Sequence, residues 1–269
     1  MTSTRWVVVI PVKRLAVAKS RLRGAVPGRP HDQLVLAMAR DTVAAVLACA
    51  LVERVIVVTD DPVVSGVVEA AGADRVPDGD EGLNAALVRG ADHAAALVRG
   101  ADHAAALVRG ADHAAALVRG ADLDREADHA AGVPVVALTA DLPALRPAEL
   151  AAALTELAEG TEPTRHTALT RHTGLTGRTG RRGYVPDARG TGTTMLAALA
   201  GVGLDPRFGP GSAAAHRASG AVELLGDWPS VRQDVDTADD LAAAAALGLG
   251  PWTAALLPPP DRYRGPHRP

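Results

Sequence analysis

"RWVVVIPV" (Arg5–Val12) is an unbroken apolar run, rich in β-branched residues, of the kind found in strands that are buried on both faces. Two more such runs follow it, "RVIVVTDD" (Arg54–Asp61) and "VPVVALTAD" (Val133–Asp141), and both end in acidic residues. Apolar residues recur at helical spacing over 33–51, and Pro62 suits the first turn of another helix. Strands that alternate with helices predict an α/β fold with a mostly parallel central sheet and flanking helices.

Length and composition predict one domain with two interruptions. Of the 269 residues, 48% are hydrophobic and 22% charged, so residues 1–250 can enclose one large core. Low-complexity insertions interrupt this domain at about 86–130 and 160–183. The Pro-rich tail over 251–269 is expected to be disordered.

Charge and residue usage exclude several classes of protein. A net charge of -3 and an aromatic content of 2% argue against nucleic acid as a partner. No apolar run reaches the roughly 20 residues of a membrane span, and the N-terminus shows no signal-peptide pattern, so we expect a cytoplasmic protein without a membrane partner. Cys49 is the single cysteine, which excludes an internal disulfide and a multi-cysteine zinc site.

Basic residues follow the first strand. Lys13 and Lys19 are the two lysines of the chain, and Arg14 and Arg21 lie in the same loop. Parallel sheets bind ligands beyond the carboxyl ends of their strands, and clustered cationic side chains suit a triphosphate. The alternative is an ordinary solvated loop.

Acidic residues at the ends of predicted strands are candidate metal ligands. Asp141 in "LTADLPAL" is followed by a proline turn, and "DVDTADDL" adds Asp234 and Asp236. Two separated carboxylates suit Mg²⁺ that also binds substrate phosphates. We expect "VRQDVDT" to be a strand and at most one of its two aspartates to face the site of Asp141. The alternative is that these residues cap helices, a role that Thr237 clearly fills.

Two glycine-rich segments, "GTGTTML" (Gly190–Leu196) and "FGPGS" (Phe208–Ser212), look like loops that run into helices. Backbone N–H groups at such helix starts can bind phosphate or carboxylate. Neither segment is a Walker A loop or a full dinucleotide fingerprint, and segments of this kind taken alone are more often plain turns. His216 follows Ser212 by four residues, and we expect it to be structural or to contact substrate rather than to act as a general base.

These motifs, taken together and in order, resemble the actinobacterial guanylyltransferases of coenzyme F420 biosynthesis. The resemblance rests on eight blocks within residues 5–248: "IPVKRLAVAKSRL", "VVTDD", "GLNAAL", "ALTADLPAL", "DARGTGTTML", "RFGPGSAAAH", "SGAVEL" and "DVDTADDL". More loosely, the chain resembles nucleotidyltransferases with a glycosyltransferase-A-like fold. The resemblance implies that GMP from GTP is joined to phosphoenolpyruvate or 2-phospho-L-lactate and that pyrophosphate is released.

The resemblance also implies roles for individual residues. Asp141 and Asp234 match the metal-holding aspartates of the family, with Mg²⁺ as the cofactor, and Asp234 is therefore preferred over Asp236. Lys13, Lys19 and Arg21 fall in the loop expected to meet the GTP phosphates, and Asn84 is a candidate nucleotide contact. The positions that match the binding of phosphoenolpyruvate are Thr193, Gly209 and Ser212. An extra residue before Gly209 leaves Thr193 and Thr194 both open as the ligand.

Two alternative functions remain open. One is a nucleotidyltransferase of the same fold that acts on another phosphorylated small molecule. The loop that carries Lys13 and Lys19, which we call the lysine loop, has no glycine before Gly24, and this argues against that alternative. The other is a non-catalytic binding protein that uses its repeat to recruit a partner. The presence of Lys13, Asp141, Ser212 and Asp234 argues against this second alternative. A downstream transferase that consumes the product is a further candidate partner.

The most conspicuous feature of the sequence is a ten-residue repeat with an Arg-Gly-Ala-Asp unit, which runs from Ala86 to Asp122. Its composition predicts a lengthened surface helix or hairpin. On a straight helix His93 and His103 would lie about 15 Å apart and could not bind one metal ion. We therefore predict that the chemistry lies at Asn84 and Asp141 on either side of the repeat.

Overall fold

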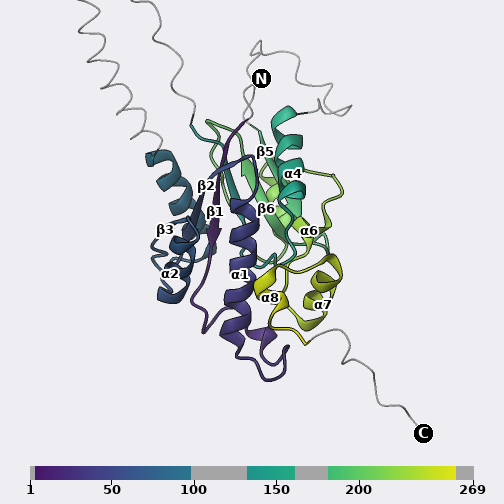
Figure 1. The fold of residues 1–269 in the computed structure, drawn as a ribbon. Coiled ribbons are helices and arrows are strands. Elements are labelled where there is room, and N and C mark those ends of the chain that lie inside the picture. Colours follow the sequence, from purple (N-terminus) through teal and green to yellow (C-terminus); the bar gives the residue numbers. More distant parts are fainter. Residues whose placement is uncertain (1–3, 98–131, 161–180, 259–269) are drawn as a thin grey trace, which may run out of the picture.

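The computed structural model describes residues 4–97, 132–160 and 181–258, and it is built on one seven-stranded sheet (Figure 1). The strand order is β3-β2-β1-β4-β6-β5-β7. Only β6 runs antiparallel to its neighbours, which confirms the mostly parallel sheet predicted from the sequence. The strands are β1 (Trp6–Pro11), β2 (Val52–Val58), β3 (Asp74–Val76), β4 (Val135–Leu138), β5 (Arg182–Pro186), β6 (Thr193–Ala198) and β7 (Val222–Glu223).

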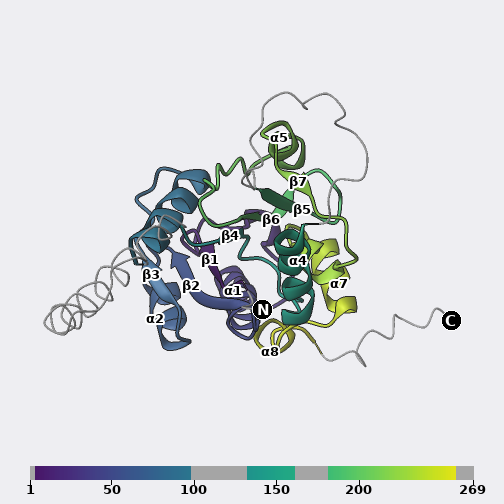
Figure 2. The same ribbon diagram turned by 90° about the horizontal axis from the view of Figure 1, so that it is seen from above.

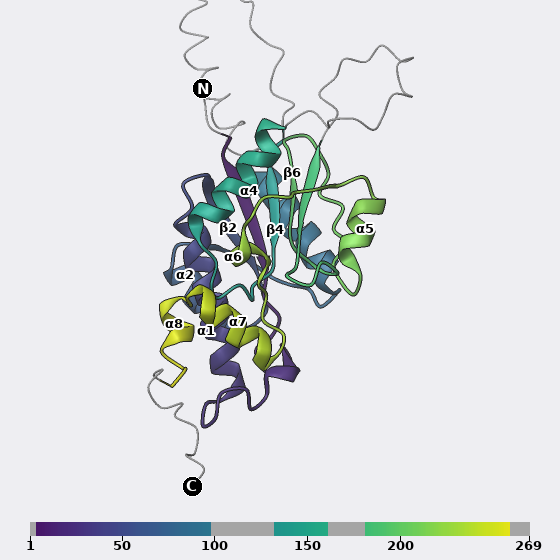
Figure 3. The same cartoon turned by 90° about the vertical axis from the view of Figure 1, so that its right-hand side faces the viewer.

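Helices cover both faces of the sheet, as the view along its edge shows (Figure 2). One face carries α1 (His31–Leu47), α2 (Pro62–Ala70), α4 (Pro147–Glu159), α6 (Pro229–Arg232) and α7 (Ala238–Leu247). The other carries a helix over 83–97 and α5 (Ser212–Ala218), so that α4 and α5 lie on opposite sides of the sheet (Figure 3). A short 3-10 helix, η1 (Ser20–Leu22), lies in the loop after β1, and α8 (Pro251–Ala254) packs against α1. Within these described residues no helix is long and apolar enough to span a membrane.

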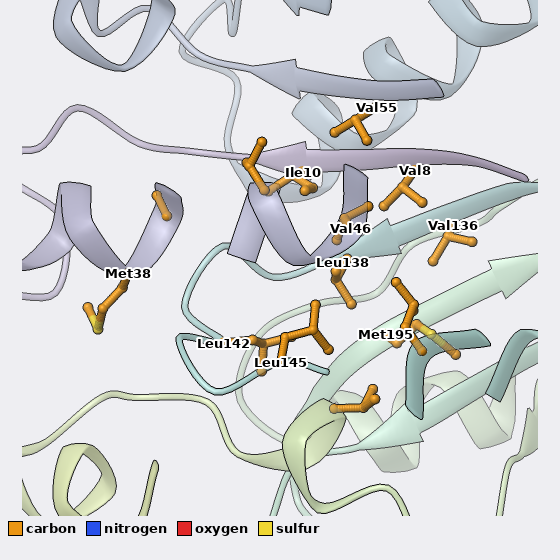
Figure 4. Close-up of a cluster of buried hydrophobic side chains, with 14 of the residues drawn as sticks. Val8, Ile10, Met38, Val46, Val55, Val136, Leu138, Leu142, Leu145 and Met195 are labelled. Carbon is orange, nitrogen blue, oxygen red and sulfur yellow. The ribbon is translucent and has the colours of Figure 1, made fainter. Parts of the chain in front are cut away.

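The larger of two apolar clusters lies between the sheet and α1. Ile10 of β1, Leu138 of β4, Met195 of β6 and Met38 of α1 all belong to this cluster, and the four side chains are almost fully buried (Figure 4). The continuous apolar runs of β1, β2 and β4 follow from this arrangement, because central parallel strands have helices on both faces. The core positions the carboxyl ends of these strands, where the polar residues begin.

The first unit of the ten-residue repeat packs into the second apolar cluster, on the other face of the sheet. Leu87 and Ala94 of the helix over 83–97 are buried against the sheet. Gly90 lies between them, so close to Val9 and Val58 that a Cβ atom would overlap their side chains. Here a glycine lets a helix approach a strand closely, which offsets its poor helix propensity. The remainder of the repeat, including the predicted surface helix or hairpin beyond residue 97, lies outside the described residues, as does most of the insertion at 160–183.

Three expectations about the local structure of the chain are wrong. Thr193–Leu196 belongs to β6 rather than to a loop entering a helix, because pairing with β4 and β5 overrides the helix propensity of "MLAAL". The segment "VRQDVDT" is not a strand, since Pro229 starts α6 and an irregular turn follows. The first residues of the tail are ordered: Asp41 accepts hydrogen bonds from the backbone N–H groups of Trp252 and Thr253 in α8.

Candidate active site

The candidate site forms along the edge of the sheet where β1, β2 and β4 end. The direction of β6 matters here. Because β6 is antiparallel to β4, its first residue, Thr193, lies at the same edge as Asp141, which follows the last residue of β4. A backbone hydrogen bond of 3.0 Å from Thr139 to Thr194 joins the two segments. The fold thus brings together residues that the sequence separates by an insertion.

The lysine loop is fastened by an aspartate that caps a neighbouring helix. The carboxylate of Asp61 accepts hydrogen bonds from the first N–H groups of α2 and, at 2.9 Å, from the backbone of Leu15. This links the loop after β1 to the end of β2. Lys19 has left-handed backbone dihedrals, with φ of 50°, and its carbonyl accepts a 2.7 Å hydrogen bond from the His31 ring. A non-glycine residue in that conformation is strained, and such strain is concentrated at functional sites.

Asp141 is positioned by Thr42 of α1. The Thr42 hydroxyl accepts a hydrogen bond from Leu142 N at 3.0 Å and lies 3.1 Å from the carbonyl of Ala140, so it contacts the chain on both sides of Asp141. The carbonyl of Asp141 in turn accepts a hydrogen bond from Val235 N at 3.1 Å. The loop that carries Asp234 and Asp236 is therefore tied directly to Asp141.

Asp141, Asp234 and Asp236 form what we call the acid cluster. One carboxylate oxygen from each lies within 4.8 Å of the other two. The expectation that at most one residue of the pair 234 and 236 would face Asp141 is wrong. Val235 between them is fully buried in the core, and residues two apart share a side of an extended chain, so both aspartates turn towards the site. The signal missed was this alternation of an apolar residue between two acids.

Charge organises the acid cluster. The ammonium group of Lys19 forms ion pairs with Asp141 and Asp236. Burial lowers the pKa of Lys19, but the charges and hydrogen bonds of Asp141 and Asp236 outweigh it and raise that pKa above its ordinary value. Burial and the nearby charge of Asp141 raise the pKa of Asp234 to about 7. One oxygen of Asp141, Oδ1, is buried and has no hydrogen-bond partner among the described residues. The cluster therefore holds more negative charge than Lys19 neutralises.

Thr193 and His216 belong to a second group of residues, which is joined by hydrogen bonds between neutral atoms. The imidazole Nδ1 of His216 lies 2.9 Å from the Thr193 hydroxyl, and Nε2 accepts a 2.9 Å hydrogen bond from the backbone N–H of Arg207. We call Thr193, Arg207 and His216 the His216 network. His216 is fully buried, and burial, aided by Arg182 and Arg207 against the opposing charge of Asp205, lowers its pKa to about 4.

A β-bulge decides which of the two adjacent threonines faces the His216 network. Pro186 of β5 pairs with Thr193 and Val185 pairs with Met195, so Thr194 is the extra residue. A bulge of this kind re-aims a side chain. Thr193 consequently turns towards α5, whereas the Thr194 hydroxyl contacts the carbonyl of Val185 at 3.4 Å. This geometry favours Thr193 over Thr194 as a ligand.

The loop before α5 is held by Asn84, which lies 124 residues away in sequence. The Asn84 amide donates to the carbonyl of Phe208 at 3.1 Å and accepts from the N–H of Phe208 at 2.8 Å. Gly209 follows with φ of 139°, and buried Ser212 begins α5. Asn84 thus supports this loop, a role that the sequence did not indicate.

A pocket of about 370 Å³ lies beside the acid cluster. It is lined by Lys13, Lys19 and Arg21 from the lysine loop, by Asp141 and Asp236, and by Phe208 from the other side. Five of the basic and acidic residues that we predicted from the sequence therefore line this pocket. Gly209 adjoins its Phe208 wall, and Thr193 is joined to that loop through His216.

Comparison with known proteins identifies the family. A family model described as "Guanylyl transferase CofC like" matches residues 6–109. A phosphoenolpyruvate guanylyltransferase of Salinispora arenicola is 52% identical over 252 residues, which are 93% of this chain and 92% of the relative. The chain belongs to the CofC-like guanylyltransferase family.

Two further phosphoenolpyruvate guanylyltransferases agree with this assignment. A phosphoenolpyruvate guanylyltransferase of Streptomyces scabiei is 44% identical to this chain, covering 93% of it and 95% of the relative. One of Geodermatophilus obscurus is 43% identical, covering 94% of each chain. Among solved structures, a putative nucleotide-diphospho-sugar transferase from Desulfovibrio desulfuricans matches with a TM-score of 0.48 at 16% identity, over 88% of this chain and 85% of that one.

Proposed function

We propose that this guanylyltransferase joins GMP from GTP to phosphoenolpyruvate, giving enolpyruvoyl-2-diphospho-5'-guanosine and pyrophosphate in coenzyme F420 biosynthesis. Relatives named phosphoenolpyruvate guanylyltransferase, 43% to 52% identical over nearly the whole chain, support the reaction. The observation that carries the proposal is the close approach of three aspartates and Lys19 beside a pocket that also has Lys13 and Arg21 in its wall. Such a pocket can hold a nucleoside triphosphate and a divalent cation together.

The acid cluster fits Mg²⁺. It offers hard oxygen ligands within 4.8 Å of one another, and buried Asp141 Oδ1 has no partner among the described residues. We propose that Asp141 and Asp234 hold the ion, with Asp236 as a further ligand. Bound there, Mg²⁺ would neutralise charge on the phosphates of the triphosphate.

The protein would act by positioning and by charge neutralisation. In the proposed reaction, a phosphate oxygen of phosphoenolpyruvate attacks the α-phosphorus of GTP, and the bond to the bridging oxygen of the β-phosphate breaks. Pyrophosphate leaves with the electron pair of that bond. The attacking oxygen is already ionised at neutral pH, so no protein base is required. We propose that Lys13, Lys19 and Arg21 stabilise the charge on the triphosphate, while Thr193, Gly209 and Ser212 orient the phosphorylated acid.

Measurement of pyrophosphate release tests the proposed nucleotide, GTP, and the proposed acceptor, phosphoenolpyruvate, together. We expect release with Mg²⁺, GTP and phosphoenolpyruvate, and much less when ATP or CTP replaces GTP. A parallel reaction with 2-phospho-L-lactate decides between the two acids, because both carry the same phosphate and carboxylate. If purified protein releases no pyrophosphate with either acid, the proposed reaction is wrong.

Two further proposals concern the setting of the reaction. GTP and phosphoenolpyruvate are cytoplasmic metabolites, so we propose a cytoplasmic enzyme. Its product contains a phosphoanhydride, which makes it a suitable donor for a later group transfer. We therefore propose a downstream transferase of the same pathway as the partner that receives the product.

A further inference from the structure

His216 is completely buried, yet both of its ring nitrogens have polar partners. Nδ1 lies 2.9 Å from Thr193 Oγ1, and Nε2 lies 2.9 Å from the backbone nitrogen of Arg207. The ring also packs edge-on against Phe208, with 5.1 Å between the ring centroids. His216 is therefore held in one orientation by the strand that begins at Thr193 and by the loop that includes Arg207 and Phe208.

The hydrogen-bond partners fix the tautomer of this ring. A backbone N–H can only donate, so Nε2 must accept with its lone pair. The neutral ring then carries its proton on Nδ1 and donates it to the Thr193 hydroxyl oxygen. Because that oxygen already accepts a hydrogen bond from His216, the hydroxyl hydrogen is directed to another acceptor.

The same histidine holds the loop before α5. The bond from Arg207 N fixes the start of this loop, and the Asn84 amide holds the next residue, Phe208, through both of its backbone groups. Gly209 comes directly afterwards with φ of 139°, a conformation that few other residues adopt. Two elements assigned to the acid substrate, the Thr193 hydroxyl and the loop at Gly209, thus share one support.

We propose that His216 is a positioning residue for the phosphorylated acid. It directs the Thr193 hydroxyl hydrogen towards the phosphate or carboxylate of the acid and fixes the loop from Arg207 to Gly209. This inference rests on the proposed function. His216 does not act as a general base, because its lone pair on Nε2 is already engaged by Arg207.

Two substitutions of His216 each remove one of its two hydrogen bonds and keep the other. His216→Gln places an amide oxygen near the position of Nε2 and keeps an acceptor for Arg207, but it removes the donor to Thr193. His216→Asn keeps a donor near Nδ1 and loses the acceptor. We expect His216→Gln to raise KM for phosphoenolpyruvate about tenfold, with KM for GTP unchanged, because an ionised ligand loses a directed donor. His216→Asn should raise it less, and His93→Gln, on the helix over 83–97, is the matched control.

A double-mutant cycle tests whether His216 acts through Thr193. Thr193→Val alone should raise KM for phosphoenolpyruvate roughly tenfold to a hundredfold, since it removes a hydrogen bond to a charged group. Adding His216→Gln to Thr193→Val should then change KM by less than about twofold. If the two effects multiply instead, His216 acts independently of Thr193 and the inference is overturned.

Nitrogen NMR of the wild-type histidine rings gives a test that needs no folded variant. We expect the His216 proton on Nδ1 at neutral pH, and a proton on Nε2 would overturn the inference. Wild-type protein that is active with phosphoenolpyruvate, together with an unchanged KM in His216→Gln, would overturn the role of His216 alone. Wild-type protein that is inactive with both acids would overturn the proposed function, and this inference with it.

Discussion

The acid cluster and the His216 network lie at the same edge of one sheet, but they are held together by different forces. In the acid cluster, three carboxylates crowd around Lys19, and one buried oxygen of Asp141 has no partner among the described residues. In the His216 network, the buried imidazole satisfies both of its nitrogens with neutral groups. The acid cluster therefore keeps a buried oxygen without a partner among the described residues, whereas the His216 ring finds a protein partner for each of its nitrogens.

This difference suggests a division of work. Like charges in a partly buried place repel one another, so we propose that the acid cluster binds a positive ion, which would in turn neutralise the charge of a triphosphate beside it. Hydrogen bonds between buried, neutral groups hold those groups in fixed positions. Such groups need little reorganisation when charge develops nearby, so the His216 network is suited to orient a substrate. The predictions below test this contrast by removing one feature from one side at a time.

The largest effect is expected for Asp141→Asn. The substitution keeps the shape of the side chain but removes the negative charge that we propose binds Mg²⁺. We therefore expect kcat to fall about a thousandfold, which is a rise of about 4 kcal/mol in the activation free energy. Asp74→Asn, on edge strand β3 and outside the pocket lining, is the control and should leave kcat unchanged. Pyrophosphate release measured against Mg²⁺ concentration checks both. Full activity with an unaltered Mg²⁺ requirement in Asp141→Asn would disprove the metal assignment.

The His216 network should give the protein a specific dependence of stability on pH. The folded-state pKa of His216 is about 4, below its ordinary value of about 6.5, so the unfolded chain binds the extra proton first. This contribution to the free energy of unfolding is present above about pH 6.5 and is lost as the pH falls through about 4, amounting to about 3 kcal/mol.

Denaturant unfolding of wild-type protein and His216→Gln between about pH 7 and pH 4 measures this term. Asp234 has a raised pKa and contributes with the opposite sign, but it is present in both proteins and cancels in the difference. The gap in stability between the two proteins should shrink as the pH falls. A gap that stays constant would mean that His216 is already protonated, or exposed, in the folded protein.

Much of the acid cluster and of the lysine loop could be predicted from the sequence, because the sequence signals for them are local. The apolar runs of β1, β2 and β4 mark central strands, and Lys19 and Asp141 lie in the loops that follow β1 and β4. Parallel strands end at a common edge, so these side chains had to meet. The position of Asp236 was missed, because the apolar Val235 between the two acids, which places both of them on one side of the chain, was not recognised as a signal.

The neutral side could not be predicted in the same way, because its contacts are distant in sequence. Thr193 faces His216 only because of a bulge created by pairing with β5, and Asn84 reaches Phe208 across 124 residues. Both features depend on tertiary packing that outweighs local propensity. The sequence indicated a ligand among Thr193 and Thr194 but held no signal that chooses between them.

Lys19→Met probes the acid cluster by removing its internal cation. Without Mg²⁺, the variant should lose roughly 2 kcal/mol of stability, less than the loss at a fully buried pair because the side chains are partly exposed. Mg²⁺ should then raise the melting temperature of the variant more than that of wild-type protein, because the ion replaces the missing charge. Lys13→Met is the matched control, since Lys13 is exposed and lies outside the cluster. Equal shifts with Mg²⁺ in all three proteins would show that Lys19 does not neutralise the cluster.

The smallest effect is expected at Asn84, where the sequence and the structure point to different roles. As a nucleotide contact, Asn84 would affect KM for GTP when replaced, but its amide is hydrogen-bonded to both backbone groups of Phe208. Asn84→Ala should therefore raise KM for phosphoenolpyruvate about fivefold, close to 1 kcal/mol, and leave KM for GTP unchanged.

Steady-state kinetics with each substrate varied in turn decides between these roles, and Asn84→Asp sharpens the result. An aspartate can still accept from the N–H of Phe208, but it faces the Phe208 carbonyl without a donor and adds negative charge beside the loop assigned to the anionic substrate, so its KM for phosphoenolpyruvate should exceed that of Asn84→Ala. A rise confined to KM for GTP would instead show that Asn84 contacts the nucleotide. The loop at Gly209 would then depend on His216 alone.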